Sequence, residues 1–371
     1  MTNYSLTLPA YSIGDRAYEE IDRICAPYGR RAVIIGGEKA LAAAEPSMRA
    51  AMKTIFAPES ILFGGEASEE NVGRLSSILD SCQYDMIFAV GGGKAIDTCK
   101  ALAEKLDKPV FSFPTIASTC AATTAVAIMY HPDGSFSHPF FISRPPHHAF
   151  INTSVIACAP EKYMWAGMGD TYAKYYESTV SSRGETLIHY HELGVTASRM
   201  CVEPVFRWGA AALQANRRGE ASFELEQVVL AITVTTGIAS IFLTNEHIID
   251  YNTGLAHGIF YSLTSNPEIE ENHLHGEVVG FGVLLLLLCD GQDDEFRRLY
   301  SFMKSVGLPT SPRDIGLTDK DVAELLPAAA AMPDVAHNPY KVTPEMLSKA
   351  FDELCRINRR CDWDKEVRNE V

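Results

Sequence analysis

The chain has 371 residues, of which 47% are hydrophobic and 21% are charged. This length exceeds what a single compact core usually supports, so we expect two domains. With 32 basic against 47 acidic residues, the net charge is −15, which argues against a protein that binds nucleic acid or an anionic membrane and leaves small molecules as the expected partners.

The first part of the chain alternates short apolar runs with segments of helical period. Strands are predicted at residues 32–35, 59–63, 84–90 and 108–114, and helices at 69–82 and 94–106. Strands separated by crossover helices form a mainly parallel sheet with helices on both faces. Further along, Pro132, Asp133 and Gly134 predict the turn of a hairpin between two extended runs.

From about Pro160 onward, long segments carry a helical period with almost no strand-like alternation, including residues 161–180 and 221–249. The most hydrophobic run, at 278–289, is much shorter than the roughly 20 residues that cross a bilayer, so we interpret it as a buried helix. We therefore expect an α/β domain over 1–153 and an all-helical domain over 154–371.

The compartment is inferred from the cysteines and from the start of the chain. Nine cysteines are scattered without a CxxC pair, which is typical of reduced thiols in the cytoplasm. The start, MTNYSLTLPAYS, lacks a basic segment followed by an apolar stretch, so we expect no secretory signal.

The predicted strand at 84–90 ends at Gly91, Gly92 and Gly93, and a helix begins directly afterwards. The free N–H groups and the positive end of the helix dipole then form an anion site, to which Lys94 adds a charge. Glycine lets a phosphate approach the backbone. Because open α/β sheets bind nucleotides at the carboxyl ends of their strands, we favour a dinucleotide diphosphate here. A tight turn that binds nothing is the alternative, since the pattern is neither a P-loop nor GxGxxG.

The loop PTIASTCAATT follows the predicted strand at 108–114. Its hydroxyl groups offer further cofactor contacts, at Thr115, Ser118, Thr119, Thr123 and Thr124. Ordinary surface-turn chemistry is the alternative interpretation of this loop.

Asp170, His257 and His275 lie among small residues in the helical half and could together hold a divalent ion. One carboxylate and two imidazoles leave open positions, which a catalytic metal needs so that a substrate oxygen can bind directly. Taken singly, each residue is more often a capping or core residue. His273 is an alternative donor, or a group that supports the ligands from behind.

These motifs, in this order, resemble the iron-containing (metal-dependent) alcohol dehydrogenase superfamily, and within it the glycerol dehydrogenase-like branch. The matching motifs are GGGKxxDTxK at 91–100, PTIAST at 114–119, GMGDTxAKYYE at 167–177, and AHG and HGE at 256–258 and 275–277. The resemblance implies the dehydroquinate synthase-like fold, in which a Rossmann-like α/β domain is followed by an all-α domain, with a nicotinamide cofactor in the cleft and one metal. Carried over by motif, the metal ligands are Asp170, His257 and His275, and the cofactor contacts are Gly92, Gly93, Lys94, Asp97, Thr115, Ser118, Thr124, Val126 and Tyr130.

The identity of the metal follows from a departure within this resemblance. Broader members of the superfamily place a histidine four residues after the aspartate, where this chain has Lys174. That is the pattern of the three-ligand glycerol dehydrogenase type, which usually holds zinc. The resemblance therefore implies zinc rather than iron.

Glycerol dehydrogenases read STDAPTS where this chain reads STCAATT, so Cys120 replaces an aspartate that helps to engage the polyol. Losing that carboxylate removes a repulsion of about 3 kcal/mol for an anion roughly 5 Å away at an effective dielectric constant of about 20. The loop is also similar to that of hydroxycarboxylate dehydrogenases (2-oxoacid reductases). We therefore expect a small 2-oxo or 2-hydroxy acid as substrate, with a polyol such as glycerol as the alternative. A redox-sensitive thiol and simple packing are other interpretations of Cys120.

The choice of cofactor turns on the segment after the strand at 32–35. Relatives that prefer NAD tend to carry an aspartate there, which accepts the ribose 2′-hydroxyl and repels a 2′-phosphate. This chain has Gly36, Gly37, Glu38 and Lys39. We therefore expect NADP(H) to be tolerated or preferred, with Gly37 and Lys39 in contact with the cofactor. Glu38 acting in place of the aspartate is the alternative.

The expected reaction is hydride transfer between nicotinamide C4 and a carbon whose oxygen binds the metal. Tyr130 and His273 are candidates for moving the proton.

A dehydroquinate synthase-like lyase is a remote alternative, because it would need a basic cluster where this chain offers mainly Lys162 and Lys174. A non-enzymatic scaffold is a further alternative and would have a broken metal site. The resemblance also implies a homo-oligomer.

Overall fold

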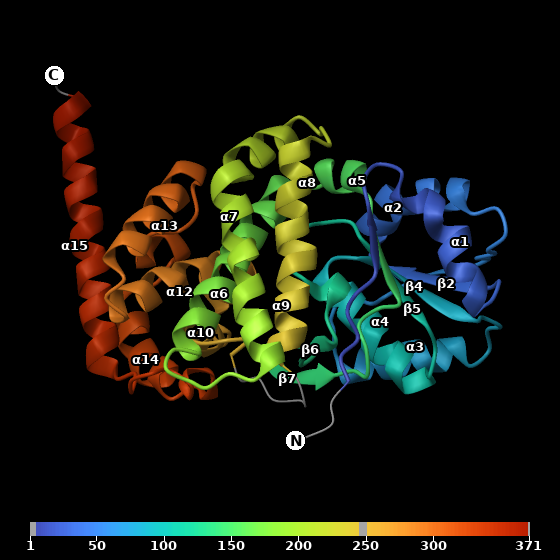
Figure 1. The fold of residues 1–371 in the computed structure, drawn as a ribbon, viewed down its shortest axis with the longest axis horizontal. Coiled ribbons are helices and arrows are strands. Elements are labelled where there is room, and N and C mark those ends of the chain that lie inside the picture. The colour runs from blue at the N-terminus through green and yellow to red at the C-terminus, as the bar shows by residue number, and fades with distance from the viewer. Residues whose placement is uncertain (1–4, 245–250, 370–371) are drawn as a thin grey trace.

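The computed structural model describes residues 5–244 and 251–369, with side chains described as far as residue 360. A sheet with flanking helices occupies one end of the molecule, and a bundle of helices occupies the other (Figure 1). The long C-terminal helix α15 (Pro344–Asn369) lies at the edge farthest from the sheet.

The main sheet is six-stranded and parallel, in the order β1-β8-β5-β4-β2-β3. Its strands are β1 (Tyr11–Ile13), β2 (Ala32–Gly36), β3 (Ser60–Leu62), β4 (Met86–Gly91), β5 (Val110–Pro114) and β8 (His148–Ile151). The helices that connect and flank them are η1 (Ala17–Glu20), α1 (Ile21–Cys25), η2 (Ala26–Tyr28), α2 (Glu38–Ala51), α3 (Glu69–Leu79) and α4 (Gly93–Leu106). All residues of β2, β4 and β5 are buried, because helices cover both faces of a parallel sheet. The predicted parallel sheet is confirmed.

Two strands of this sheet were not predicted. β1 and β8 pair with each other, and β8 joins them to β5. Each is too short to show a period of its own, and their pairing depends on distant parts of the chain.

The predicted hairpin is also confirmed. Strands β6 (Val126–Tyr130) and β7 (Phe136–Phe141) pair antiparallel outside the main sheet. The turn contains Gly134 at a φ of +89°, and the Asp133 side chain accepts hydrogen bonds from the backbone and hydroxyl of Ser135. A positive φ suits glycine, which explains the residue at this position.

After Ile151, the described chain contains helices and loops without a further strand. The helices are α5 (Thr153–Ala157), α6 (Glu161–Ser181), α7 (His189–Arg217), α8 (Phe223–Val229), the π-helix η4 (Leu230–Thr235), α9 (Thr236–Leu243), α10 (Leu255–Leu263), α11 (Pro267–Asn272), α12 (His275–Cys289), α13 (Asp293–Val306), η6 (Pro312–Ile315), α14 (Asp319–Ala330), η7 (Pro333–Val335) and α15. The helical second half is confirmed. Residues 245–249 of the predicted helical run lie outside the described residues, and the division at 153/154 stays a prediction.

The hydrophobic run at 278–289 lies in α12, which is buried over most of its length, as expected. Among the described residues, Phe223–Leu243 is the one helical stretch long and apolar enough to cross a membrane, and 72% of its most apolar window is buried inside the protein. Such length, apolar composition and burial are also found in helices of a protein core, so they do not by themselves indicate a membrane span.

Glycine residues allow α6 and α12 to pack closely at the point that matters for the site. A Cβ atom on Gly169 would lie 2.1 Å from the Gly276 carbonyl oxygen, and one on Gly276 would lie 2.1 Å from the Ala166 carbonyl oxygen. Any larger residue would push the two helices apart. This contact holds Asp170, next to Gly169, beside His275, next to Gly276.

Candidate active site and metal centre

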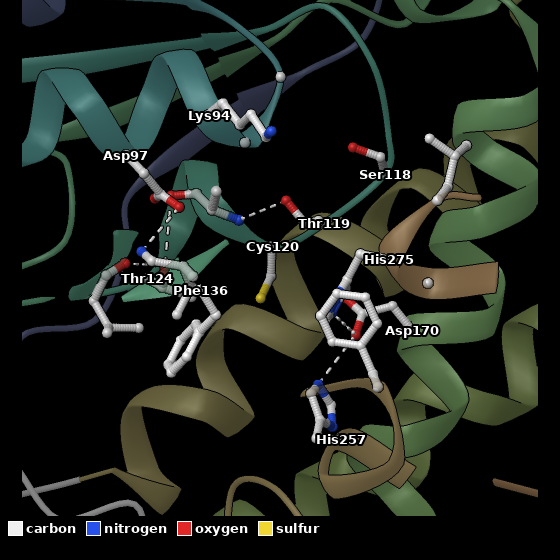
Figure 2. Close-up of a pocket in the computed structure, with 18 of the residues that line it drawn as sticks. Lys94, Asp97, Ser118, Thr119, Cys120, Thr124, Phe136, Asp170, His257 and His275 are labelled. Carbon is white, nitrogen blue, oxygen red and sulfur yellow. Dashed lines mark hydrogen bonds and ion pairs between the residues drawn. The ribbon is translucent and has the colours of Figure 1, made fainter. Parts of the chain in front are cut away.

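A cavity of about 710 Å³ lies between the sheet and the helical half (Figure 2). It is lined by most of the residues that the sequence predicted, namely Gly37, Gly92, Gly93, Lys94, Asp97, Ser118, Thr119, Cys120, Thr124, Val126, Tyr130, Asp170, His257, His273 and His275. Lys39 and Thr115 are not among its lining residues: Lys39 is exposed, and the buried Thr115 donates its backbone N–H to the Gly91 carbonyl oxygen. The cavity therefore brings the predicted cofactor and metal residues into one space.

The glycine turn forms the end of the cavity next to the sheet. Gly91 ends β4 with a φ of +149°, Gly92 is the N-cap of α4, and Gly93 is its first residue. A Cβ atom on Gly92 would lie 2.5 Å from Ile116 Cδ1, so a side chain there would compete for space at the helix end. Backbone N–H groups of a helix N-terminus facing a cavity suit the diphosphate of a dinucleotide.

Two charged residues next to this turn have protein partners. Lys94 Nζ donates to Glu66 Oε2 at 2.7 Å and lies 5.2 Å from the centre of the Tyr130 ring. Asp97 pairs with the buried Lys100 at 2.7 Å and accepts a hydrogen bond from the Ile128 backbone. Asp97 therefore lines the cavity and, through Lys100 and the Ile128 backbone, also helps to hold the neighbouring wall in place.

Lys100, which the sequence analysis did not single out, holds the loop that carries Cys120. Its ammonium group donates to the carbonyl oxygens of Ala121 and Val126 and to the Thr124 hydroxyl. Its spacing of three residues from Asp97 was the available signal, since such pairs meet on a helix face. Thr123, predicted as a possible cofactor contact, instead donates to the Thr233 carbonyl oxygen in the π-helix η4.

Asp170 on α6, His257 on α10 and His275 on α12 converge, with one ligand atom from each within 4.8 Å of the others (Figure 2). Asp170 Oδ1 lies 3.6 Å from His257 Nε2 and 3.4 Å from His275 Nε2. Two ligands bound tetrahedrally to one ion at about 2.1 Å each lie roughly 3.4 Å apart. The spacing and chemistry of these donors therefore fit a divalent ion.

Glu177 supports His257 from behind, and the sequence analysis did not identify it as a site residue. Its carboxylate accepts hydrogen bonds from His257 Nδ1 at 2.6 Å and from the His257 backbone N–H at 2.9 Å. This contact fixes the ring so that Nε2 faces Asp170, as carboxylates commonly do for metal-binding histidines. Its position seven residues after Asp170, two turns along α6, was the available signal.

The electrostatics of the three side chains match this geometry. Burial raises the pKa of Asp170, but the hydrogen bonds and positive charges of the two imidazoles outweigh that effect and hold the pKa well below its usual value. Burial lowers the pKa of His257, but the carboxylates of Glu177 and Asp170 raise it to about 10. The site thus strongly favours a cation next to Asp170, in the form of imidazolium protons or of a metal ion.

Replacing Glu177 with glutamine should weaken the binding of a divalent ion such as zinc at this site by about 10- to 100-fold, because the amide holds the His257 ring less firmly and carries no charge. Titration against a competing zinc chelator measures this change. Glu203→Gln is the matched control, since Glu203 pairs with Arg298 on the surface. Equal zinc affinity in the Glu177 variant and the wild type would contradict the role assigned to Glu177.

His273 and Cys120 also line the cavity. His273 Nδ1 is hydrogen-bonded to Glu277 Oε1 at 2.9 Å, so this histidine stands beside the converging group rather than in it. Burial, followed by the charge of Asp170, raises the pKa of Cys120 to about 12. The thiol is therefore neutral at ordinary pH, which argues against a reactive thiolate and gives this wall no negative charge at position 120.

Known proteins match both the sequence and the fold. The family described as iron-containing alcohol dehydrogenase matches residues 9–151. Glycerol dehydrogenase of Thermotoga maritima is 35% identical over 310 residues, covering 80% of this chain and 82% of that protein. Hydroxycarboxylate dehydrogenase A of Escherichia coli is 30% identical, covering 87% and 89% of the two chains. The crystal structure of a probable glycerol dehydrogenase from Sinorhizobium meliloti superposes with a TM-score of 0.82 at 26% identity, covering 96% of this chain and 100% of that one.

The resemblance and the fold predicted from the sequence are thereby confirmed. The structural match covers 96% of the chain and therefore extends over both the sheet and the helical half. The chain belongs to the iron-containing alcohol dehydrogenase family, whose members are metal-dependent, nicotinamide-linked oxidoreductases that act on the CH–OH groups of alcohols and polyols.

Proposed function

We propose that this protein transfers a hydride between a nicotinamide dinucleotide and a small polyol, such as glycerol, or the corresponding carbonyl compound. The observation that carries the proposal is the single cavity that joins the glycine turn to Asp170, His257 and His275. The Cys120 loop in the sequence favoured a 2-oxo or 2-hydroxy acid. Glycerol dehydrogenases predominate among the similar proteins, which supports the polyol that stood there as the alternative.

In this proposal Asp170, His257 and His275 hold a divalent ion, with zinc preferred. The turn at Gly92 and Gly93 binds the cofactor diphosphate. The remaining proposed cofactor contacts in the cavity wall are Gly37, Lys94, Asp97, Ser118, Thr119, Thr124, Val126 and Tyr130. NAD(H) is the family cofactor, and NADP(H) remains part of the proposal because the turn after β2 offers no aspartate. When bound, the ion supplies a Lewis acid and the nicotinamide carries the hydride.

The side chains around the converging group suit this chemistry. Phe136, Phe260 and Tyr261 line the cavity and exclude water from the reacting atoms. Burial and nearby carboxylates raise the pKa of Tyr130, so its hydroxyl stays protonated at ordinary pH and donates a hydrogen bond, but it is a poor group for transferring a proton. His273, whose Nδ1 is hydrogen-bonded to Glu277, is the better candidate for moving the proton.

A 2-oxo acid remains the second candidate substrate, because one observation favours it. Figure 2 shows Cys120 between Lys94, in the first turn of α4, and the converging side chains. The thiol is neutral, and glycerol dehydrogenases carry an aspartate at this position. A substrate carboxylate would meet no repulsion from this position. The loop is thus compatible with both substrate classes.

The test of the proposed function is a screen with NADH and NADPH against dihydroxyacetone, glycolaldehyde, 2-oxobutanoate and 2-oxoglutarate, with and without added zinc. We expect zinc-dependent oxidation of the reduced cofactor with dihydroxyacetone. Absence of turnover with every carbonyl compound, in protein that contains zinc and binds the cofactor, would leave the dehydroquinate synthase-like lyase and the non-enzymatic scaffold as alternatives.

Replacing Cys120 with aspartate should shift substrate preference toward the polyol. A carboxylate at this position opposes a substrate carboxylate roughly 5 Å away by about 3 kcal/mol, which corresponds to a decrease of roughly 100-fold in kcat/KM for 2-oxobutanoate relative to dihydroxyacetone. Steady-state kinetics on both substrates measure the ratio. Cys158→Asp is the matched control, since Cys158 is exposed. An unchanged ratio would mean that position 120 does not face the substrate.

We further infer that the protein is cytoplasmic, works without nucleic acid or membrane, and assembles as a homo-oligomer. The cysteines whose side chains are described are all free, which supports a reducing compartment. Size-exclusion chromatography with light scattering tests the assembly.

A further inference from the structure

Lys174 is a buried lysine in the wall of the cavity, one helical turn after Asp170 on α6. Its side chain is buried, with 5% of the residue exposed, and it lines the same space as the converging side chains. Its Nζ donates to the carbonyl oxygen of Asn252 at 2.6 Å and to the side-chain oxygen of the same residue. Both of these hydrogen-bond acceptors are neutral oxygens, and they come from a single residue.

Lys100, the other deeply buried lysine near the site, shows what full compensation of such a charge requires. With 1% of the residue exposed, it pairs with the Asp97 carboxylate at 2.7 Å and also donates to Ala121, Thr124 and Val126. It is not among the residues that line the cavity. A buried ammonium group is costly unless it is both paired and hydrogen-bonded.

Lys174 differs from Lys100 in having no ion-pair partner and fewer hydrogen-bond partners. Among the residues that the structure describes, no carboxylate oxygen lies within the 4.0 Å of Nζ that defines an ion pair. An ammonium group has three donors, so one donor of Lys174 remains for the cavity. It has no lone pair in this state, so it does not serve as a fourth metal ligand.

Lys174 makes the charge around the converging side chains more favourable for an anion. A divalent ion held by Asp170, His257 and His275 and the Lys174 ammonium together balance the carboxylates of Asp170, Glu177 and Asp334, whereas without Lys174 the group would be net negative. The positive charge of Lys174 also acts on the neutral Cys120 thiol, which places the two residues at the same part of the cavity. This corner of the site thus combines a cationic donor with a side chain at position 120 that carries no negative charge.

We propose that Lys174 determines substrate specificity by binding the oxygen on the carbon next to the reacting carbon, and that it binds a carboxylate there more strongly than a hydroxyl. The inference rests on the proposed function and deepens it. Side chains at positions i and i+4 of a helix lie about 5–6 Å apart, which suits one substrate whose reacting oxygen lies at the ion site of Asp170, His257 and His275 and whose neighbouring oxygen lies at Lys174. Lys174 is then the residue that extends a polyol site to 2-oxo acids.

The test replaces Lys174 with methionine, which keeps the length of the side chain and removes the charge. We expect kcat/KM for 2-oxobutanoate to fall about 100-fold and that for dihydroxyacetone by at most about 5-fold, since a charge-assisted hydrogen bond is lost in the first case and a weaker one in the second. Calorimetric binding of 2-oxobutanoate to the complex with the oxidised cofactor, where no hydride can be transferred, should weaken by a similar factor. Zinc content should be unchanged.

Two further variants separate this role from a structural one. Asn252→Asp keeps the shape of the Lys174 partner but supplies a carboxylate, so we expect about a 10-fold loss for 2-oxobutanoate with little loss of stability. Lys162→Met makes the same substitution at an exposed position of the same helix and should change neither substrate.

The outcomes distinguish the two proposals. A wild-type protein that turns over neither class of substrate overturns the proposed function and this inference with it. A wild-type protein that is active on both substrates, with a ratio unchanged in the Lys174→Met variant, overturns the specificity role alone.

Discussion

Replacing Asp170 with asparagine is expected to lower kcat/KM for glycerol by about 1000-fold and to leave the purified protein with little bound divalent metal. Asp170 is the one carboxylate among the three converging side chains, and both imidazoles face its Oδ1 atom. Without its charge the remaining ligands are neutral, and the Lewis acid contribution of several kcal/mol is lost with the ion. Elemental analysis and steady-state kinetics on the same preparation measure both effects.

Asp22→Asn is the matched control for this substitution. The Asp22 carboxylate accepts hydrogen bonds from the backbone N–H groups of Lys53, Thr54 and Ile55, outside the cavity. The control should lower the melting temperature and leave zinc content and kcat/KM near wild-type values. A fully zinc-loaded, active Asp170→Asn protein would show that the metal is held elsewhere.

Replacing Gly93 with aspartate should raise the KM for the nicotinamide cofactor about 100-fold or more without unfolding the protein. Gly93 is the first residue of α4, where a carboxylate stabilises the helix dipole and occupies the place of an incoming phosphate. Two like charges roughly 5 Å apart repel by about 3 kcal/mol at an effective dielectric constant of about 20. Fluorescence titration with NADH and NADPH measures the loss of binding.

Gly73→Asp is the control for the glycine substitution. Gly73 lies in α3, and a Cβ atom at this position would meet nothing within 4 Å. Its cofactor affinity should equal that of the wild type. Unchanged affinity in the Gly93→Asp protein as well would place the cofactor diphosphate away from the turn after β4.

Much of the fold is determined by local patterns in the sequence. The run at 84–90 is continuously apolar because β4 is buried on both faces, and the glycines after it mark the place where α4 begins. Gly134 marks the hairpin turn because its φ is positive. β1 and β8 were not predicted because their stability comes from pairing with each other and, for β8, with β5, and not from their own few residues.

The sequence predicts only part of the candidate site. Asp170, His257 and His275 were identified by residue type and motif, and the structure brings them together through the close glycine contact between α6 and α12. Lys39 and Thr115 follow the right strands, yet neither lines the cavity. Their positions just after these strands correctly predicted that Lys39 and Thr115 lie near the cavity, but not whether their side chains line it.

The sequence by itself therefore determined the order of most elements, the glycine turn after β4 and the residue types of the converging side chains, because these depend on backbone freedom and on chemistry that each residue carries alone. Only the tertiary structure decided that Glu177 contacts His257, that Lys100 holds the Cys120 loop and that Lys174 contacts Asn252 in the cavity wall. The physical reason is that hydrogen bonds and charge pairs depend on distances of a few ångströms between side chains, and most of those distances here join residues far apart in the chain.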